Sequence, residues 1–224
     1  MLKEFALLKR HPFLSHQQFR MSWSAADTAL PADRGHPGPR HVRNIIDATA
    51  NPVFAKNAYD GIAEWWHGDE QPAANNRARF DGLYVDLQTS ASVLALEIRI
   101  LDRGGGKVKF MSLLKRKADL SPAEFSRYWA TKHAQLVQTV PEVCQYFRRY
   151  VQNHCIPGSG ERVDGTRCEV DIDGIVEIWF DSLSDLENAM TSRRYMEVLR
   201  PDEAKFVALP NIRLLALEEA AVAE

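Results

Sequence analysis

One histidine of the sequence lies at helical spacing from two large aromatic residues. Phe125, Trp129 and His133 recur every four residues, a spacing that places their side chains on one buried face of a helix. An imidazole on such a face loses hydration, which favours its neutral form and lets it accept a proton near neutral pH. We therefore predict that His133 is a general base and that Phe125 and Trp129 lie beside its substrate. The alternative is a core histidine with one hydrogen-bonded nitrogen.

Three further side chains are candidates for the same chemistry. Tyr128 lies about 100° around the helix from Trp129, where its hydroxyl could donate to an enolate or phenolate oxygen or lie in water at a rim. Tyr150 and His154 share one face of a predicted strand by period-two alternation. If that face is turned to the helices, both line the pocket of His133; if it is turned to a partner sheet, both fill an interface. The predicted catalytic residues are therefore His133, Tyr128, Tyr150 and His154.

A short series of strands and helices in the second half of the chain must position these residues. Ser121, Pro122 and Glu124 form a helix start, with serine as the N-cap, proline in the first turn and glutamate at the third position. This helix is expected to end at Pro141. The other elements predicted here are strands at 108–114, 146–154, 174–180 and 212–217, a helix at 184–191 and a polar loop at 157–166.

The first half of the chain repeats this pattern. Residues 3–23 match residues 109–129 at nine of 21 positions without a gap, and residues 60–66 match 173–179 at five of seven. The elements predicted in the first copy are strands at 4–8, 41–46, 61–66 and 93–101 and helices at 15–24 and 73–80. Because three consecutive glycines indicate a linker, the predicted domains are a first, divergent repeat at 1–103, a linker at 104–106, a second repeat at 107–218 and a tail at 219–224.

The order strand–helix–strand–strand–helix–strand is typical of the ferredoxin-like unit, in which both helices cover one face of an antiparallel sheet. The uncovered face of that sheet needs a partner, and a second copy of the unit can supply it. The sequence therefore predicts an α+β fold in which two ferredoxin-like βαββαβ repeats pack sheet to sheet as one pseudo-dimeric α+β barrel.

Aromatic side chains suit a flat, apolar ligand that is held by a few polar anchors. The predicted substrate-binding residues come from both copies and are Trp129, Phe125, Trp179, His41, His67 and Trp66. His41 and His67 are included because they stand in the first copy at the positions of Tyr150 and Phe180. By the gapless alignment, Asp27 stands at the position of His133. The alternative for at least three of the tryptophans is a place in the core.

Two acidic residues, Glu64 and Glu177, occupy the same place in the two copies. Because both recur, they are expected to serve the fold at least in part. A carboxylate beside apolar neighbours could act as an acid. We expect instead that Glu177 pairs with an arginine across the sheet, either Arg99 or Arg213.

A resemblance to a known family appears at residues 113–136. A basic pair follows the first strand of the second copy, and a Leu-Ser turn, Glu-Phe, an aromatic pair and a histidine four residues after Trp129 come next. Pro141, Tyr150 and Asn153 continue the pattern. This segment resembles the EthD-like family of dimeric α+β barrel proteins, well over 108–217 and weakly over 3–101. The resemblance implies a small pocket between helices and sheet, and cofactor-independent chemistry on aromatic or polyketide compounds, such as cyclisation, dehydration or oxidation of anthrone-like rings.

The composition argues against several classes of function. The 224 residues carry a net charge of −2, so nucleic acid is not an expected partner, and no apolar run is long enough to span a membrane. Charges interrupt the apolar N-terminus, unlike a signal peptide, so a cytoplasmic protein is expected. Three cysteines without a C-x-x-C pair indicate free thiols, and seven scattered histidines predict no metal site. We expect no cofactor, although related barrels bind haem through a helix histidine.

Our leading hypothesis is a cofactor-independent enzyme that acts on an aromatic or polyketide-like small molecule. It would be a lyase, dehydratase or cyclase, with His133 as general base and Tyr128 or Tyr150 stabilising the oxyanion. The first alternative is a cofactor-free monooxygenase of the same superfamily, which would consume oxygen. The second is a non-catalytic protein that binds aromatic ligands. The sequence leaves open whether two pseudo-dimeric barrels associate as a homodimer.

Overall fold

The computed structural model describes residues 1–29, 41–46, 59–67, 80–210 and 212–220 of the chain. The helix expected at 73–80 lies outside these residues, except for Phe80. The described chain forms two compact units. Unit 1 comprises residues 1–96, 158–170 and 217–224, and unit 2 comprises residues 97–157 and 171–216.

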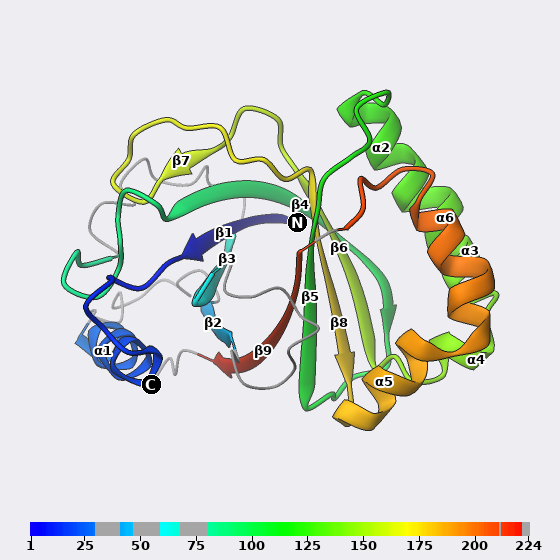
Figure 1. Ribbon diagram of the computed structural model, residues 1–224, viewed down its shortest axis with the longest axis horizontal. Helices are drawn as coiled ribbons and strands as arrows, with labels where there is room; N and C mark the ends of the chain where they lie inside the picture. Colours follow the sequence, from blue (N-terminus) through cyan, green and yellow to red (C-terminus); the bar gives the residue numbers. More distant parts are fainter. Residues whose placement is uncertain (30–40, 47–58, 68–79, 211, 221–224) are drawn as a thin grey trace. The chain divides into compact units, whose positions relative to one another are not determined.

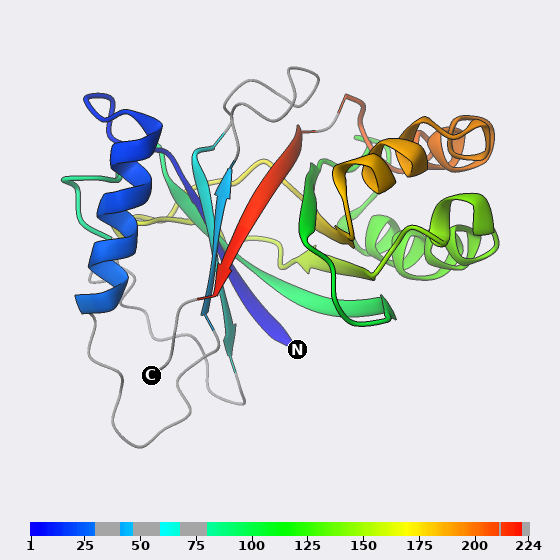
Figure 2. The ribbon, with the colours of Figure 1, turned by 90° about the horizontal axis from the view of Figure 1, so that it is seen from below.

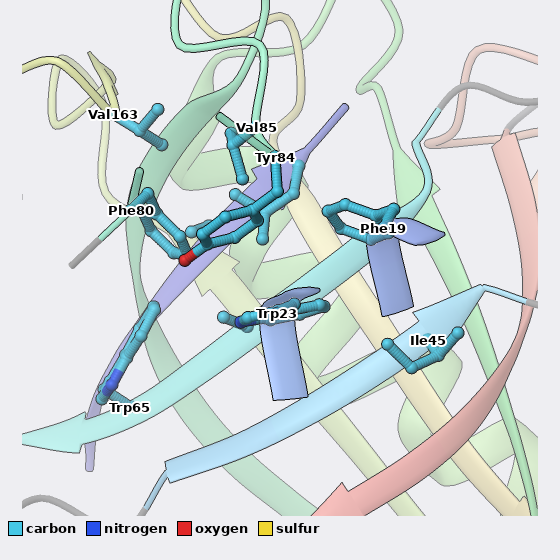
Figure 3. Close-up of a cluster of buried hydrophobic side chains, with 11 residues drawn as sticks. Phe19, Trp23, Ile45, Trp65, Phe80, Tyr84, Val85 and Val163 are labelled. Carbon is cyan, nitrogen blue, oxygen red and sulfur yellow. The ribbon is translucent and has the colours of Figure 1, made fainter. Parts of the chain in front are cut away.

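Unit 1 is built on an antiparallel sheet in the order β2–β3–β1–β4. Its strands are β1 (Leu2–Leu8), β2 (His41–Ile46), β3 (Gly61–His67), the first half of β4 (Ala91–Asp102) and the short strand β7 (Glu161–Arg162), which pairs with β4. Helix α1 (His16–Ala29) supplies Phe19 and Trp23 to a hydrophobic core that also holds Tyr84, Val85 and Val163 (Figure 3). The strands and the helix predicted for these residues are confirmed, with small differences at their ends.

Unit 2 has the same antiparallel arrangement, in the order β9–β5–β8–β6. Its strands are β5 (Val108–Leu114), β6 (Arg149–Cys155), β8 (Gly174–Phe180) and β9 (Ile212–Ala220). Figures 1 and 2 show a layer of helices along one face of β5, β8 and β6. The helices are α2 (Pro122–Tyr128), the π-helical turn η2 (Trp129–His133), α3 (Ala134–Gln138), α4 (Pro141–Cys144), α5 (Leu183–Thr191), a second π-helical turn η3 (Tyr195–Leu199) and α6 (Arg200–Glu203). The chain is therefore α+β, as predicted.

The helix start predicted at Ser121 is confirmed. The Ser121 hydroxyl accepts a hydrogen bond from the backbone N–H of Glu124 at 3.3 Å, and the Glu124 carboxylate accepts one from the Ser121 backbone at 2.8 Å. Ser15 and Gln18 make the same pair of hydrogen bonds at the start of α1, at 3.2 and 2.8 Å. These bonds satisfy backbone groups that a helix otherwise leaves unpaired, so they fix where each helix begins.

The prediction of one regular helix from Ser121 to Pro141 is wrong in its middle and at its end. After Tyr128 the chain passes into the π-helical turn η2, and α3 ends at Gln138. Pro141 lies in the first turn of α4, a position that suits proline because no intrahelical donor is needed there. A π turn is wider than an α turn, so η2 changes the direction of the side chains that it carries.

Each unit packs a tryptophan against a glycine at the start of a strand. A Cβ atom added to Gly61 would lie 2.4 Å from Cζ3 of Trp23, and one added to Gly174 would lie 2.5 Å from Cζ3 of Trp129. Real Cβ atoms do not approach other atoms so closely, so both positions require glycine for space. The same contact in both units matches the internal repeat of the sequence.

A second repeated contact is a buried ion pair. In each unit a lysine Nζ lies 2.6 Å from a glutamate oxygen, and an asparagine amide donates to the same carboxylate. The residues are Lys3, Glu64 and Asn44 in unit 1 and Lys109, Glu177 and Asn153 in unit 2. The expectation that Glu177 pairs with an arginine is therefore wrong, because Lys109 on the neighbouring strand lies on the same face of the sheet. Buried charges must be paired, so these residues serve the fold.

Candidate active site

Unit 2 holds a cavity between its helices and its sheet. The empty volume is about 590 Å³, which includes the opening to solvent. Most of the lining side chains are aromatic or aliphatic. The polar ones are Ser112, His133, Tyr150, Tyr195, Glu203 and Arg213. A largely apolar cavity with a few converging polar groups is typical of a site for a small, flat ligand.

His133 lines this cavity and is almost fully buried. Its Nδ1 lies 2.9 Å from Oδ2 of Asp202, which comes from α6. This hydrogen bond is the largest cause that holds the pKa of Asp202 well below its ordinary value, so Asp202 is a carboxylate and can only accept. The hydrogen of the neutral imidazole must therefore be on Nδ1, which leaves the lone pair on Nε2. The arrangement suits a general base.

Tyr128 also bonds to Asp202 and does not line the cavity. Its hydroxyl donates to Oδ1 of Asp202 at 2.7 Å, and Nζ of Lys205 lies 3.0 Å from the same oxygen. Burial, followed by the hydrogen bond to Asp202, raises the pKa of Tyr128. The structure thus places Tyr128 behind the His133–Asp202 pair, where it can position the carboxylate.

Tyr150 lines the cavity, and its hydroxyl is oriented by Gln152, which lies outside the cavity lining. The hydroxyl accepts a hydrogen bond from Nε2 of Gln152 at 2.9 Å, and the same amide donates to the carbonyl oxygen of Trp129 at 3.0 Å. Burial raises the pKa of Tyr150 well above its ordinary value, so the group stays protonated. Among the described residues no acceptor lies within hydrogen-bond distance of its O–H, so this hydrogen is available to a ligand.

His154 lies behind Tyr150 and outside the cavity. Its Nε2 lies 3.2 Å from Oε1 of Gln152, and its Nδ1 lies 2.8 Å from the hydroxyl of Ser126. Since the amide oxygen can only accept, Nε2 must donate, and Nδ1 then accepts from Ser126. Burial lowers the pKa of His154 to about 4, so the ring is neutral at physiological pH. His154 therefore fixes the orientation of Gln152, and through it that of Tyr150.

The cavity also carries a polar cluster that was not predicted from the sequence. The hydroxyl of Tyr195 donates to the Glu203 carboxylate, with distances of 3.1 and 3.2 Å to its two oxygens, and accepts from Nη2 of Arg213 at 3.2 Å. Arg200 pairs with Glu203 at 2.9 Å. Burial, aided by the charge of Glu203, raises the pKa of Tyr195 to about 12. Pro201 followed by two acidic residues is a helix-start pattern that could have pointed to α6.

Two other predicted substrate-binding residues of unit 2 lie outside the cavity lining. Phe125 packs against Trp129 and Phe206, with ring centroids 5.6 and 5.8 Å apart. Trp179 alternates on β8 with the cavity residue Ile178, so its side chain lies on the other face of the sheet. There Lys109 and Arg149 lie over its ring. Of the predicted residues, the structure therefore brings His133, Tyr150 and Trp129 together in the cavity.

The three predicted residues of the first copy belong to unit 1 and are held there in contacts of their own. His41 stacks on Trp65 with ring centroids 4.6 Å apart. Nε2 of His67 lies 3.0 Å from the buried carboxylate of Glu4. Nζ of Lys3 lies 4.3 Å from the ring of Trp66.

Within the described ranges, no three histidine, cysteine or acidic side chains lie close enough together to hold a metal ion. No helix in this part of the chain is both long and apolar enough to cross a membrane.

Solved structures resemble the chain over its whole length. An anthrone oxidase-like protein has a TM-score of 0.62 at 9% identity and covers 100% of this chain and 94% of its own. A protein of Lactobacillus acidophilus that is provisionally described as a monooxygenase has a TM-score of 0.53 at 8% identity, with coverage of 97% and 93%. A provisionally described chlorite dismutase has a TM-score of 0.55 at 11% identity, with coverage of 98% and 95%. Identities this low establish a shared fold.

A comparison with protein-family models finds a match in the second half of the chain. No curated protein matches the chain significantly. The model of the EthD domain, however, matches residues 117–210, a segment that includes His133, Tyr150 and Asp202. The resemblance seen in the sequence is thereby confirmed for residues 117–210, which match the model of the EthD domain.

Proposed function

We propose that the protein is a cofactor-independent enzyme that acts on an aromatic or polyketide-like small molecule by acid–base chemistry. The observation that carries the proposal is the placement of His133, with Nδ1 on Asp202, in the same apolar cavity as the Tyr150 hydroxyl. A base and a hydrogen-bond donor in one cavity are what proton abstraction next to a carbonyl or phenol group requires. The predicted pseudo-dimeric barrel, and a homodimer of such barrels, belong to the same proposal.

In the proposed reaction, Nε2 of His133 removes a proton from a carbon atom next to the carbonyl group of the ligand. The negative charge that develops on the carbonyl oxygen is stabilised by the hydrogen bond from Tyr150. Asp202 stabilises the imidazolium that forms, as a carboxylate does behind a catalytic histidine. Loss of a leaving group or attack on a second carbonyl would follow, so the activity is that of a lyase, dehydratase or cyclase.

A cofactor-free monooxygenase is the second candidate. It is favoured by the fold shared with the anthrone oxidase-like protein and the provisionally described monooxygenase. The same deprotonated aromatic would then react with molecular oxygen. The two candidates differ in one measurable quantity, because only a monooxygenase consumes oxygen in proportion to substrate.

The test is a thermal-shift panel of aromatic ketones, anthrones and phenols on the wild type and the His133→Gln variant. Each compound that raises the melting temperature is then followed by chromatography and with an oxygen electrode. His11→Gln is the matched control, because His11 lies in unit 1. We expect a compound that binds both the wild type and His133→Gln but is consumed only by the wild type and the control, without oxygen uptake.

Two results would contradict the proposal. Equal turnover by His133→Gln and the wild type would show that His133 is not the base. Compounds that bind tightly and are never converted by the wild type would indicate a protein that binds aromatic ligands without catalysis.

A further inference from the structure

The guanidinium of Arg213 is a charged group on the wall of an otherwise largely apolar cavity. Its one hydrogen bond within the described chain is the bond from Nη2 to the hydroxyl of Tyr195, and no carboxylate of the described residues lies within ion-pair distance of it. Its remaining N–H groups therefore have no acceptor among the residues that the structure describes. An arginine presents several donors in a planar fork that matches the two oxygens of a carboxylate.

The nearby Glu203 does not neutralise Arg213. Its carboxylate is already paired with Arg200 at 2.9 Å and accepts the hydrogen bond from Tyr195. Arg200, which lies outside the cavity lining, thus pairs with Glu203, and Arg213 is left without a carboxylate partner among the described residues. In a cavity that is mostly apolar, this positive charge favours a ligand that brings a negative charge of its own.

The sheet sets the separation between the backbones of Arg213 and Tyr150. Arg213 on β9 is paired across β5 and β8 with Gln152 on β6, through Ser112 and Val176. Tyr150 lies on β6 two residues from Gln152, on the same face. Three strand spacings and two residues place the Cα atoms of Arg213 and Tyr150 about 15 Å apart. Both side chains line the same cavity, so one ligand can contact both of their polar ends.

We propose that the ligand of this cavity is an aromatic carboxylic acid whose carboxylate binds Arg213 and whose second oxygen, at the far end of the ring system, accepts the hydrogen bond of Tyr150. This inference rests on the proposed function for the site itself and narrows its substrate class. Tyr195 is a positioning residue in this arrangement, because it holds the guanidinium through the 3.2 Å hydrogen bond.

The test compares the binding of a hydroxynaphthoate, with its hydroxyl and carboxylate at opposite ends, with that of the hydroxynaphthamide of the same shape, by isothermal titration calorimetry. Because the amide lacks the charge, the wild type is expected to bind the acid about 10- to 100-fold more tightly. The preference should disappear in Arg213→Met and persist in Arg194→Met, which removes an exposed arginine outside the cavity lining. Arg213→Lys, which keeps the charge without the fork, should retain a smaller preference for the acid.

The other end of the ligand is tested with unsubstituted naphthoate. Tyr150→Phe is expected to abolish the preference of the wild type for hydroxynaphthoate over naphthoate, while its preference for acid over amide remains. Circular dichroism of each variant establishes that it is folded. If Arg213→Met does not fold, Arg213→Lys tests whether the planar guanidinium of Arg213 recognises the carboxylate. An unaltered preference for the acid over the amide in Arg213→Lys would contradict such recognition.

Two results would overturn the inference: equal binding of acid and amide by the wild type, or an intact preference for the acid in Arg213→Met. His133→Gln separates this inference from the proposed function, since it should bind the acid like the wild type and convert nothing. If the wild type prefers the acid but never converts any aromatic acid, the proposed function fails and the binding inference stands.

Discussion

The carboxylate of Asp202 lies 2.9 Å from Nδ1 of His133, although the two residues are 69 positions apart in the chain. The same carboxylate accepts hydrogen bonds from Tyr128 and Lys205, so it joins the helix of His133 to α6. A carboxylate that holds one nitrogen of an imidazole fixes the tautomer and presents the other nitrogen as a base.

Replacing Asp202 by asparagine should disable the base while keeping its shape. The amide can donate to Nδ1, which favours the wrong tautomer, so turnover of a substrate from the thermal-shift panel should fall between about 10² and 10⁴-fold. Nitrogen NMR should show the hydrogen of His133 moving from Nδ1 to Nε2. Lys205→Met is the control, because Lys205 is exposed and is one of three partners of Asp202; its effect should be small. Wild-type turnover by Asp202→Asn would disprove the role of the pair.

The stability of the protein should fall in mild acid because of His154. Its pKa in the folded protein is about 4, against an ordinary value of 6.5. Between these values the unfolded chain binds a proton that the folded chain does not, so the free energy of unfolding decreases as the pH falls from 6.5 towards 4. The decrease attributable to His154 is up to about 3 kcal/mol. Urea unfolding of wild type and His154→Gln at several pH values measures it, and identical pH dependence in both proteins would exclude this cause.

The buried lysine of unit 2 should be more damaging to remove alone than together with its partner. Lys109→Met leaves the Glu177 carboxylate buried without its cation and should cost about 3–5 kcal/mol. The double variant Lys109→Met and Glu177→Gln should recover a substantial part of that loss, because no charge is then left unpaired. Urea unfolding of the two single variants and the double variant gives the coupling energy; strictly additive losses would argue against the pairing.

Gly174→Ala should displace Trp129 from its place in the cavity wall. The added methyl group would lie 2.5 Å from the indole, so the ring must move, at a cost of about 1–3 kcal/mol. The near-ultraviolet circular dichroism and ligand binding should change together. Gly82→Ala is the control, since its Cβ would meet Leu87 at an ordinary 3.4 Å. If Gly174→Ala is as stable as this control, the steric argument is incorrect.

The elements of this fold could be predicted because their signals are local. The capping pattern at Ser121 fixes a helix start, and the run from Gly174 to Phe180 is a strand in the sequence and in the structure. Because the two halves repeat the same order of strands and helices, an element predicted in one half could be checked against the corresponding segment of the other half. Local patterns also placed His133 on the buried face of a helix and Tyr150 on a strand, but they left open whether the face of Tyr150 is turned to that helix.

The partners of those residues could not be predicted, because they depend on distant segments. Asp202 reaches His133 only when α6 folds back over η2, and the short helix was not expected. An arginine, Arg99 or Arg213, is the expected partner of Glu177 across the sheet, but side-chain alternation puts Arg213 on the cavity face and Lys109 beside Glu177. The π-helical turn at Trp129 leaves no mark in residue types, since its spacing of aromatic residues is also that of an α-helix.

That turn makes the two halves of the chain differ at one point. α1 is α-helical from His16 to Ala29, whereas the corresponding helix of unit 2 contains η2, which begins at the tryptophan that both halves share. A π turn holds one residue more than an α turn, so an alignment that allows for this residue pairs His133 with Ala26 instead of Asp27. The extra residue of η2 thus changes which side chain of this helix is turned into the cavity of unit 2.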